Sequence, residues 1–155
     1  MIEFVMVEKE EHIDEIKMLF VEYANSLNFN LCFQDFNREL KELPGEYARP
    51  NGRLILAKDK ESYVGCVGLR KLEDGICEMK RLYVKPEYRR KGIGRSLAER
   101  IISEAKLIEY ERMRLDTISN MTEAISLYET LGFVEIGPYR ANPIKGAVYL
   151  ELKLK

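Results

Sequence analysis

Three cations and two glycines stand close together in the middle of the chain, as Arg89, Arg90, Lys91, Gly92 and Gly94. The apolar spacing that follows predicts a helix that begins at the first glycine. The first turn of a helix carries partial positive charge from unpaired N–H groups, so cations are unfavourable there unless an anion lies among them. Because glycine has no Cβ, it lets those N–H groups approach a phosphate closely. The pattern therefore predicts a cradle for a pyrophosphate group.

The same glycines do not fit two common nucleotide-binding motifs. No Lys-Ser or Lys-Thr pair follows them, as a P-loop requires, and Leu97 stands where the third glycine of a dinucleotide fingerprint would be. A Gly-x-Gly pair alone fits equally well a plain helix start whose charged side chains are solvated. A second motif elsewhere in the chain is needed to choose between these two interpretations.

Two motifs together resemble the GNAT superfamily of N-acetyltransferases. Arg89, Gly92 and Gly94 follow an expected strand and precede a long amphipathic helix, like the family's acetyl-CoA signature R-x-x-G-x-G. Residues 124–133, AISLYETLGF, resemble its A-x-x-L-Y-x-x-x-G-F segment and lie at the distance that the family shows. The resemblance implies a transferase in which an amine attacks acetyl-CoA directly within a ternary complex. The alternative, of another class, is a non-catalytic acyl-CoA sensor or regulatory subunit.

The resemblance also implies which residues hold acetyl-CoA. Main-chain groups at the end of the strand before the loop would bind the thioester and the pantetheine arm, and the Leu82 N–H would donate to the oxyanion. The family usually has Asn seven residues before the tyrosine of its second motif, where this chain has Met121, so Asn120 would have to make that contact from one residue earlier. The implied set is Leu82, Tyr83, Val84, Arg89, Arg90, Lys91, Gly92, Ile93, Gly94, Arg95 and Asn120.

Acyl transfer to an amine needs a base for the ammonium proton and an acid for the leaving thiolate. By resemblance, Glu78 is the base, and we expect burial beside a partly apolar cleft to raise its pKa. The alternative is that Glu78 pairs with Arg70 or Lys71 on the neighbouring strand. Tyr128 stands at the position of the family's tyrosine acid, although a tyrosine packed under the sheet would fit the same pattern.

The acceptor is expected to be a small-molecule or peptide amine, and its identity does not follow from the sequence. By resemblance, its site is bounded by Phe29 to Phe33 and by a loop that holds Tyr139, Arg140 and Asn142, where an arginine could bind a substrate carboxylate. The sole histidine, His12, lies in the first expected helix and is interpreted as an exposed residue, so a Ser-His or Cys-His mechanism has little support.

Composition limits the other possibilities. The 155 residues include 25 basic and 26 acidic residues, a net charge of -1, so we expect no nucleic-acid or membrane partner. The three cysteines, Cys32, Cys66 and Cys77, are odd in number and have no metal-like spacing, which indicates no metal site and a reducing, cytoplasmic location. The length predicts one domain over residues 1–155, as a monomer or a homodimer.

The hydrophobic periodicity predicts alternating strands and helices. The expected strands are 2–7, 53–58, 62–72, 76–84, 112–116, 133–137 and 147–154, and the expected helices are 10–27, 35–43, 92–110 and 121–131, the last capped by Ser119 or Asn120. This order predicts an α/β protein of the α+β type, with a mixed, mostly antiparallel sheet of six to seven strands flanked by about four helices. The resemblance implies that its two central parallel strands splay apart to bind acyl-CoA.

Overall fold

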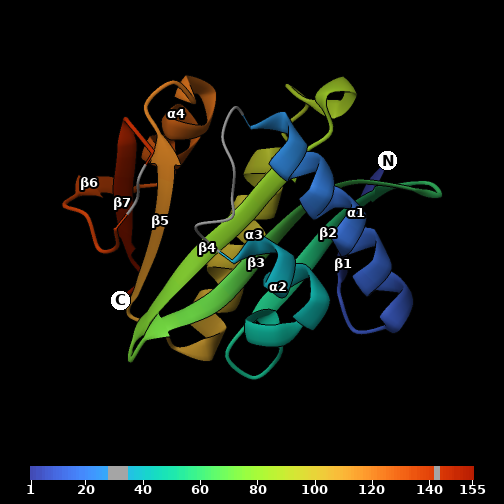
Figure 1. Cartoon of the computed structure of the whole chain (residues 1–155), viewed down its shortest axis with the longest axis horizontal. Helices are drawn as coiled ribbons and strands as arrows, with labels where there is room; N and C mark the ends of the chain where they lie inside the picture. The colour runs from blue at the N-terminus through green and yellow to red at the C-terminus, as the bar shows by residue number, and fades with distance from the viewer. Residues whose placement is uncertain (28–34, 142–143) are drawn as a thin grey trace.

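The computed structural model describes residues 1–27, 35–141 and 144–155. Its strands are β1 (Ile2–Met6), β2 (Arg53–Asp59), β3 (Ser62–Glu73), β4 (Ile76–Val84), β5 (Arg112–Ile118), β6 (Val134–Ile136) and β7 (Ala147–Lys153). Its helices are α1 (Glu10–Ser26), α2 (Phe36–Glu42), α3 (Ile93–Ile108) and α4 (Thr122–Thr130), with short 3-10 turns at Gly45–Tyr47 and Pro86–Tyr88. Figure 1 shows these elements along the chain.

The seven strands form one sheet in the order β1-β2-β3-β4-β5-β7-β6. All neighbouring strands run antiparallel except β4 and β5, which are parallel. A parallel pair needs a crossover, and α3 supplies it between β4 and β5. The predicted fold class, a mixed and mostly antiparallel sheet with flanking helices, is confirmed.

The parallel pair stays together over only three residues of each strand. Pairing begins at Ile76 with Arg112 and ends at Glu78 with Arg114, whereas β4 continues to Val84 and β5 to Ile118. Figure 1 shows the two strands close together at their N-terminal ends and diverging toward their C-terminal ends. The main chain of residues 79–84 is therefore not paired to β5, and no other strand of the described residues pairs with it on that side.

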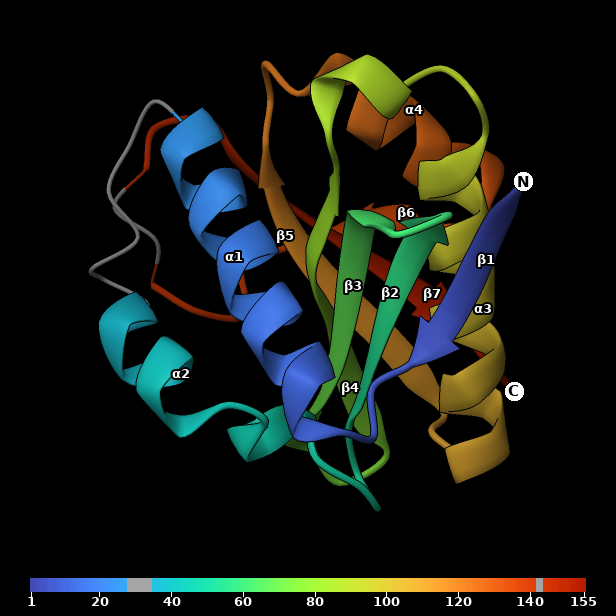
Figure 2. The ribbon, with the colours of Figure 1, turned by 90° about the vertical axis from the view of Figure 1, so that its right-hand side faces the viewer.

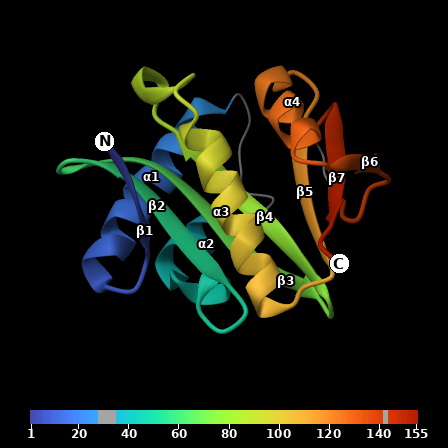
Figure 3. The same ribbon diagram turned by 180° about the vertical axis from the view of Figure 1, so that it is seen from behind.

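Helices cover both faces of the sheet. Figure 2 shows α1 and α2 on one face, and Figure 3 shows α3 against the other. Apolar side chains at helical spacing make this possible, since α3 buries Ile93, Leu97, Ala98, Ile101, Ile102 and Ala105, and α1 buries Ile16, Leu19 and Phe20. Each face has its own apolar cluster, so β4 lies between two packed layers.

The observed boundaries fall close to the predicted ones, with one error at a helix start. The cap residue of α4 is Met121, and neither Ser119 nor Asn120 caps the helix with its side chain, so that prediction is wrong. Both residues lie instead in an exposed turn after β5.

Candidate active site

A β-bulge distorts β4 just beyond its last residue paired to β5. Cys66 of β3 pairs with Tyr83 and Gly68 pairs with Lys80, so two steps on β3 correspond to three on β4. Arg81 lies at the extra step with a φ of 60°, in the left-handed region that non-glycine residues rarely adopt. The bulge re-aims the side chains and the main chain of the strand at the point where β5 leaves it.

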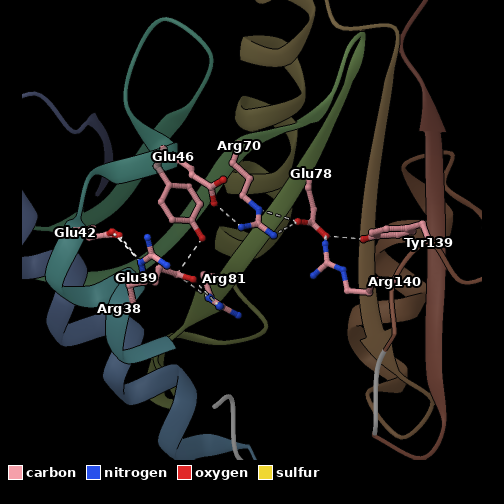
Figure 4. Close-up of polar contacts among 10 residues, drawn as sticks. Arg38, Glu39, Glu42, Glu46, Arg70, Glu78, Arg81, Tyr139 and Arg140 are labelled. Atoms are coloured by element: carbon pink, nitrogen blue, oxygen red, sulfur yellow. Dashed lines mark hydrogen bonds and ion pairs between the residues drawn. The ribbon is translucent and has the colours of Figure 1, made fainter. Parts of the chain in front are cut away.

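Glu78 lies at the centre of a buried polar network and its side chain is 0% exposed. The Arg70 Nε donates to Oε1 at 2.9 Å, and the Tyr139 hydroxyl donates to Oε2 at 2.7 Å. Arg140 also donates to Oε2. Figure 4 shows this carboxylate between Arg70 of β3 on one side and the residues of the β6–β7 connection on the other. One carboxylate therefore links the two halves of the sheet at the point where β4 and β5 separate.

The charge state of Glu78 differs from the one expected. Burial by itself would raise the pKa of this carboxyl, but the positive charges of Lys80, Arg70 and Arg140, with the hydrogen bond from Arg140, outweigh burial and lower the pKa to about 2. The expectation of a raised pKa is wrong, because the surroundings are cationic rather than apolar. The alternative that Glu78 pairs with Arg70 is confirmed, while Lys71 contacts Asp74 at 3.0 Å.

Further charged residues extend this network toward α2. Arg81 forms an ion pair with Glu39 at 2.8 Å, and the Tyr47 hydroxyl donates to the same carboxylate at 3.0 Å. Arg70 also contacts Glu46 at 2.7 Å. Figure 4 shows Glu39 and Arg81 beside the group around Glu78. These contacts hold α2 and the Gly45–Tyr47 turn against the bulged part of β4.

Lys80 lies in the same network and is 6% exposed. Burial and the nearby charge of Arg81 lower its pKa to about 7, although Glu78 opposes the shift. Near neutral pH this lysine therefore exists in both protonation states. The sequence analysis did not single out Lys80, Arg81 or Glu39. The signal was present, since cations in the middle of an apolar strand are seldom buried unless they are paired, and so indicate a buried ionic site.

The predicted anion cradle lies where β4 passes into α3. Gly92 is the N-cap residue of α3 with a φ of 81°, and no side chain caps the helix or places a carboxylate in its first turn. A Cβ built on Gly92 would meet no atom within 4 Å. The first N–H groups of α3 are thus open to an anion, with Arg90 and Lys91 exposed beside them.

The cations of this loop join β4 to α4. The Arg89 Nε donates to the Val84 carbonyl at 2.9 Å, and its guanidinium lies 5.7 Å from the ring centre of Tyr83. On the other side, Arg90 contacts Glu123 at 3.2 Å and the Arg95 guanidinium donates to the Thr130 hydroxyl at 3.0 Å. The structure therefore brings the loop, the end of β4 and α4 together around the splay.

Tyr128 of α4 is buried, with its ring 5.7 Å from that of Phe133 in an edge-to-face contact. Burial raises the pKa of its phenol, and the Tyr23 phenol of α1 adds to that shift. Burial raises the pKa of the Tyr23 phenol, while the charge of Arg81 on β4 lowers it and the charge of Asp116 on β5 raises it. Tyr128 belongs to the same apolar cluster as Leu97 and Ile101 of α3.

Three other expectations have different outcomes. His12 is 9% exposed and packs edge-on against Tyr63, so the prediction of an exposed residue is wrong: this face of α1 packs on the sheet. Phe29 to Phe33 and Asn142 lie outside the described residues.

Cys66 and Cys77 are buried free thiols, and burial raises the pKa of both, to about 12 for Cys77. Neither thiol has the low pKa of a nucleophile.

Comparison with known proteins agrees with the fold. Residues 13–133 match the family model for the acetyltransferase (GNAT) family. An uncharacterized N-acetyltransferase of Dictyostelium discoideum is 36% identical over 212 aligned positions, which cover 97% of this chain and 98% of that protein. A GNAT-family acetyltransferase of Staphylococcus aureus superposes over the full length of both chains with a TM-score of 0.80 and 21% identity.

A further solved structure is the PaiA N-acetyltransferase of Thermoplasma acidophilum in complex with coenzyme A. It has a TM-score of 0.74 and 19% identity, over 99% of each chain. In the part of the chain that the structure describes, no helix is both long and apolar enough to cross a membrane. The match to the family model and the relative of similar length show that the chain belongs to the GNAT family of acetyltransferases.

Proposed function

We propose that this chain is an N-acetyltransferase, which transfers the acetyl group of acetyl-CoA to a primary amine by direct attack in a ternary complex. The observation that carries the proposal is the divergence of β4 from β5 beside the uncapped N-terminus of α3. An open strand edge can bind an extended amide chain by main-chain hydrogen bonds, as in strand addition. The pantetheine arm of coenzyme A is such a chain, and its pyrophosphate suits a helix N-terminus.

In this proposal the coenzyme follows the path of the chain from β4 into α3. Main-chain groups of Leu82, Tyr83 and Val84 bind the thioester and the pantetheine arm. The pyrophosphate lies against the N–H groups from residue 91 to residue 95, among Arg89, Arg90 and Lys91. Gly92 supports this placement, since its positive φ turns the main chain into the helix and no Cβ covers the amides. Asn120, which is exposed in the turn after β5, is proposed to contact the pantetheine arm.

The transfer itself needs no covalent intermediate on the protein. The amine nitrogen attacks the thioester carbon, a C–N bond forms, the C–S bond breaks and the ammonium loses one proton. The Leu82 N–H donates to the oxyanion, which the bulge at Arg81 supports by turning the main chain beyond the last residue paired to β5. Tyr128 donates its proton to the leaving sulfur, and its raised pKa keeps the phenol protonated until then.

Glu78 stays the proposed base for the amine, acting through a water molecule because both of its oxygens already accept hydrogen bonds; with a pKa of about 2 the carboxylate does not retain the proton, which passes on to solvent. With a pKa of about 2, the Glu78 carboxylate is not protonated between pH 5 and pH 9, so its titration does not change the rate of acetyl transfer in that range. Any change of the rate with pH in that range would come from the titration of another group. A pH profile of the parent and of Glu78→Gln therefore tests the role directly. If Glu78 is the base, the variant is slower at every pH and still binds the coenzyme.

The proposal is tested by titrating acetyl-CoA into the protein in a calorimeter and then measuring thiol release with a panel of primary amines. We expect heat of binding, loss of that heat on substitution of the cradle, and thiol release with at least one amine. No binding of the coenzyme would refute the proposal. Binding without release on any amine would instead favour the acyl-CoA sensor.

A further inference from the structure

We infer that Arg140, in the connection between β6 and β7, is a positioning residue for acetyl transfer, and that it acts by bridging Glu78 of β4 to Asp116 of β5 where the two strands diverge. The inference rests on the proposed acetyl transfer. It gives Arg140 a different role from the one expected from the sequence, because the guanidinium acts through Glu78 and does not bind a carboxylate of the acceptor.

The side chains that Arg140 joins lie on one face of the sheet. Residues in register on neighbouring strands point to the same face, and so do residues two apart along a strand. Arg114 is in register with Glu78, and Asp116 lies two residues further along β5. Tyr149 of β7 is in register with Asp116. Glu78 and Asp116 therefore point to the same side, one from each of the diverging strands.

The guanidinium of Arg140 contacts both carboxylates. Its Nη2 donates to Glu78, and its Nη1 lies 3.8 Å from the Asp116 Oδ2. Figure 4 shows this guanidinium beside the Glu78 carboxylate. Main-chain pairing of β4 with β5 ends at Glu78, so the bridge spans the first step at which the two strands are no longer paired. Because a guanidinium is rigid and planar, it can hold two carboxylates at a fixed separation.

The surroundings of Arg140 hold it in place for this contact. The Tyr149 hydroxyl donates to the Arg140 carbonyl at 3.2 Å, which ties the main chain of the connection to the residue opposite Asp116. The guanidinium lies 5.0 Å from the ring centre of Tyr139, and that ring lies 5.3 Å from the ring of Tyr149. The Arg140 side chain is only 19% exposed. Little rearrangement is therefore needed to keep Glu78 in position during the reaction.

Arg140 also affects the charge of Glu78. Burial raises the pKa of this carboxyl, whereas the hydrogen bond and the positive charge of Arg140 both lower it. An opposite charge at this range typically lowers the pKa of a carboxyl by about 1 to 3, so loss of Arg140 should raise the pKa of Glu78 by a similar amount. The other titratable or charged groups around Glu78 are Arg70 of β3, Lys80 of β4, Arg114 and Asp116 of β5, and Tyr139 of the connection.

The first test needs no substrate. The carboxyl ¹³C resonance of Glu78, assigned with Glu78→Gln, reports the protonation of this residue during a pH titration by NMR. In Arg140→Met the resonance should titrate about 1 to 3 pH units higher than in the parent. Arg140→Lys keeps the charge and should titrate nearer the parent. Arg112→Met is the control, since Arg112 is 49% exposed at the start of β5 and pairs with Glu151, and its variant should titrate as the parent does.

Kinetics with acetyl-CoA and primary amines at pH 7 separate the bridge from the charge. Arg140→Met should lower kcat about 10- to 100-fold with the KM of the amine within about threefold, because a misplaced base slows the chemical step. Arg140→Lys should remain about tenfold slow, since one ammonium group does not replace the planar fork. In a double-mutant cycle, Asp116→Asn should add little to Arg140→Met, because both remove the same bridge.

Three results would overturn the inference and leave acetyl transfer standing. The first is a Glu78 resonance in Arg140→Met that titrates within 0.5 pH units of the parent. The second is full additivity in the cycle with Asp116→Asn. The third is an unchanged kcat with a raised KM only for amines that carry a carboxylate, which would make Arg140 an acceptor-binding residue. If Arg140→Met does not fold, Arg140→Lys and Asp116→Asn take its place in the cycle. Absence of thiol release by the parent with every amine would instead overturn the proposed function, and the role of Arg140 in transfer with it.

Discussion

Replacing Glu78 by glutamine is the sharpest test of the polar network. The substitution keeps the size of the side chain and removes its charge, so Arg70 and Arg140 lose their shared anion in a site with 0% exposure. The amide also has only one acceptor oxygen for donors that now bind two, and its NH₂ group faces Arg140 or Tyr139. We expect a folded but clearly less stable protein.

The size of the effect follows from the pKa. A carboxyl whose pKa falls from 4.5 to about 2 on folding stabilises the protein by about 3 kcal/mol in its ionised form. Removing one partner of a buried ion pair typically costs about 3 to 5 kcal/mol, which agrees with that figure. For a chain of this length each kcal/mol shifts the midpoint by about 2 to 4 °C, so Tm should fall by roughly 6 to 12 °C.

Thermal and urea unfolding at several pH values measure this directly. Because the pKa of Glu78 is lowered on folding, its contribution is complete above about pH 4.5 and is lost as pH falls toward 2. The deficit of Glu78→Gln should therefore be full at pH 7 and shrink below pH 4.5. Glu73→Gln is the matched control, since that carboxylate is 59% exposed at the end of the neighbouring strand, and its loss should cost under about 0.5 kcal/mol.

Two results would refute this reasoning. A Glu78→Gln midpoint within 2 °C of the parent at pH 7 would show that the carboxylate does not hold the network together. A deficit that is equally large at pH 3.5 and pH 7 would show that size or packing, and not charge, makes the difference.

Four further substitutions probe the other parts of the site. Gly92→Ala should lower the free energy of unfolding by about 1 to 2 kcal/mol, seen as a lower Tm, because a φ of 81° strains a residue with a Cβ. Gly94→Ala should keep the parent's Tm, since its Cβ would lie 3.7 Å from the Val84 side chain. It should nevertheless weaken acetyl-CoA binding in calorimetry, because the Cβ covers the main-chain amides. Lys80→Met should raise the free energy of unfolding by about 2 kcal/mol or more at pH 6 and by much less at pH 10. The reason is that burying the charged lysine destabilises the folded parent fully below pH 7, and this destabilisation disappears as pH rises toward 10.5. Tyr128→Phe should leave Tm and coenzyme binding within error and slow thiol release about 100-fold; an unchanged rate would remove Tyr128 from the role of acid.

The sequence predicts the elements well wherever the apolar period is strong. The strand 76–84 is predicted with its observed bounds, and the helix 92–110 is found at Ile93–Ile108, because its buried residues follow the helical period without interruption. The cap of α4 could not be predicted in this way. Ser119 and Asn120 are good cap residues by type, but the turn after β5 places Met121 at the cap position instead.

The partners of Glu78 could be predicted only in part. Arg70 lies eight residues away across a hairpin, so strand pairing makes it a candidate, and this alternative is confirmed. Tyr139 and Arg140 lie 61 and 62 residues away, and only the completed sheet brings them to the carboxylate. Their hydrogen bonds and charges reverse the direction of the pKa shift, which is why an expectation based on burial alone was wrong.

The bulge at Arg81 shows how the buried charges and the open strand edge depend on each other. A φ of 60° costs about 1 kcal/mol or more for a non-glycine residue and persists only where other contacts hold it. The guanidinium of Arg81 supplies such contacts, with two hydrogen bonds to Glu39 at 3.0 and 2.8 Å from a side chain that is 3% exposed. Because Glu39 belongs to α2 and also accepts from Tyr47, the packing of a distant helix fixes the main chain of β4 at the splay. The same ion pair therefore stabilises the strained strand and fixes the guanidinium of Arg81 beside it, so that one interaction sets both the path of the main chain and the position of this charge.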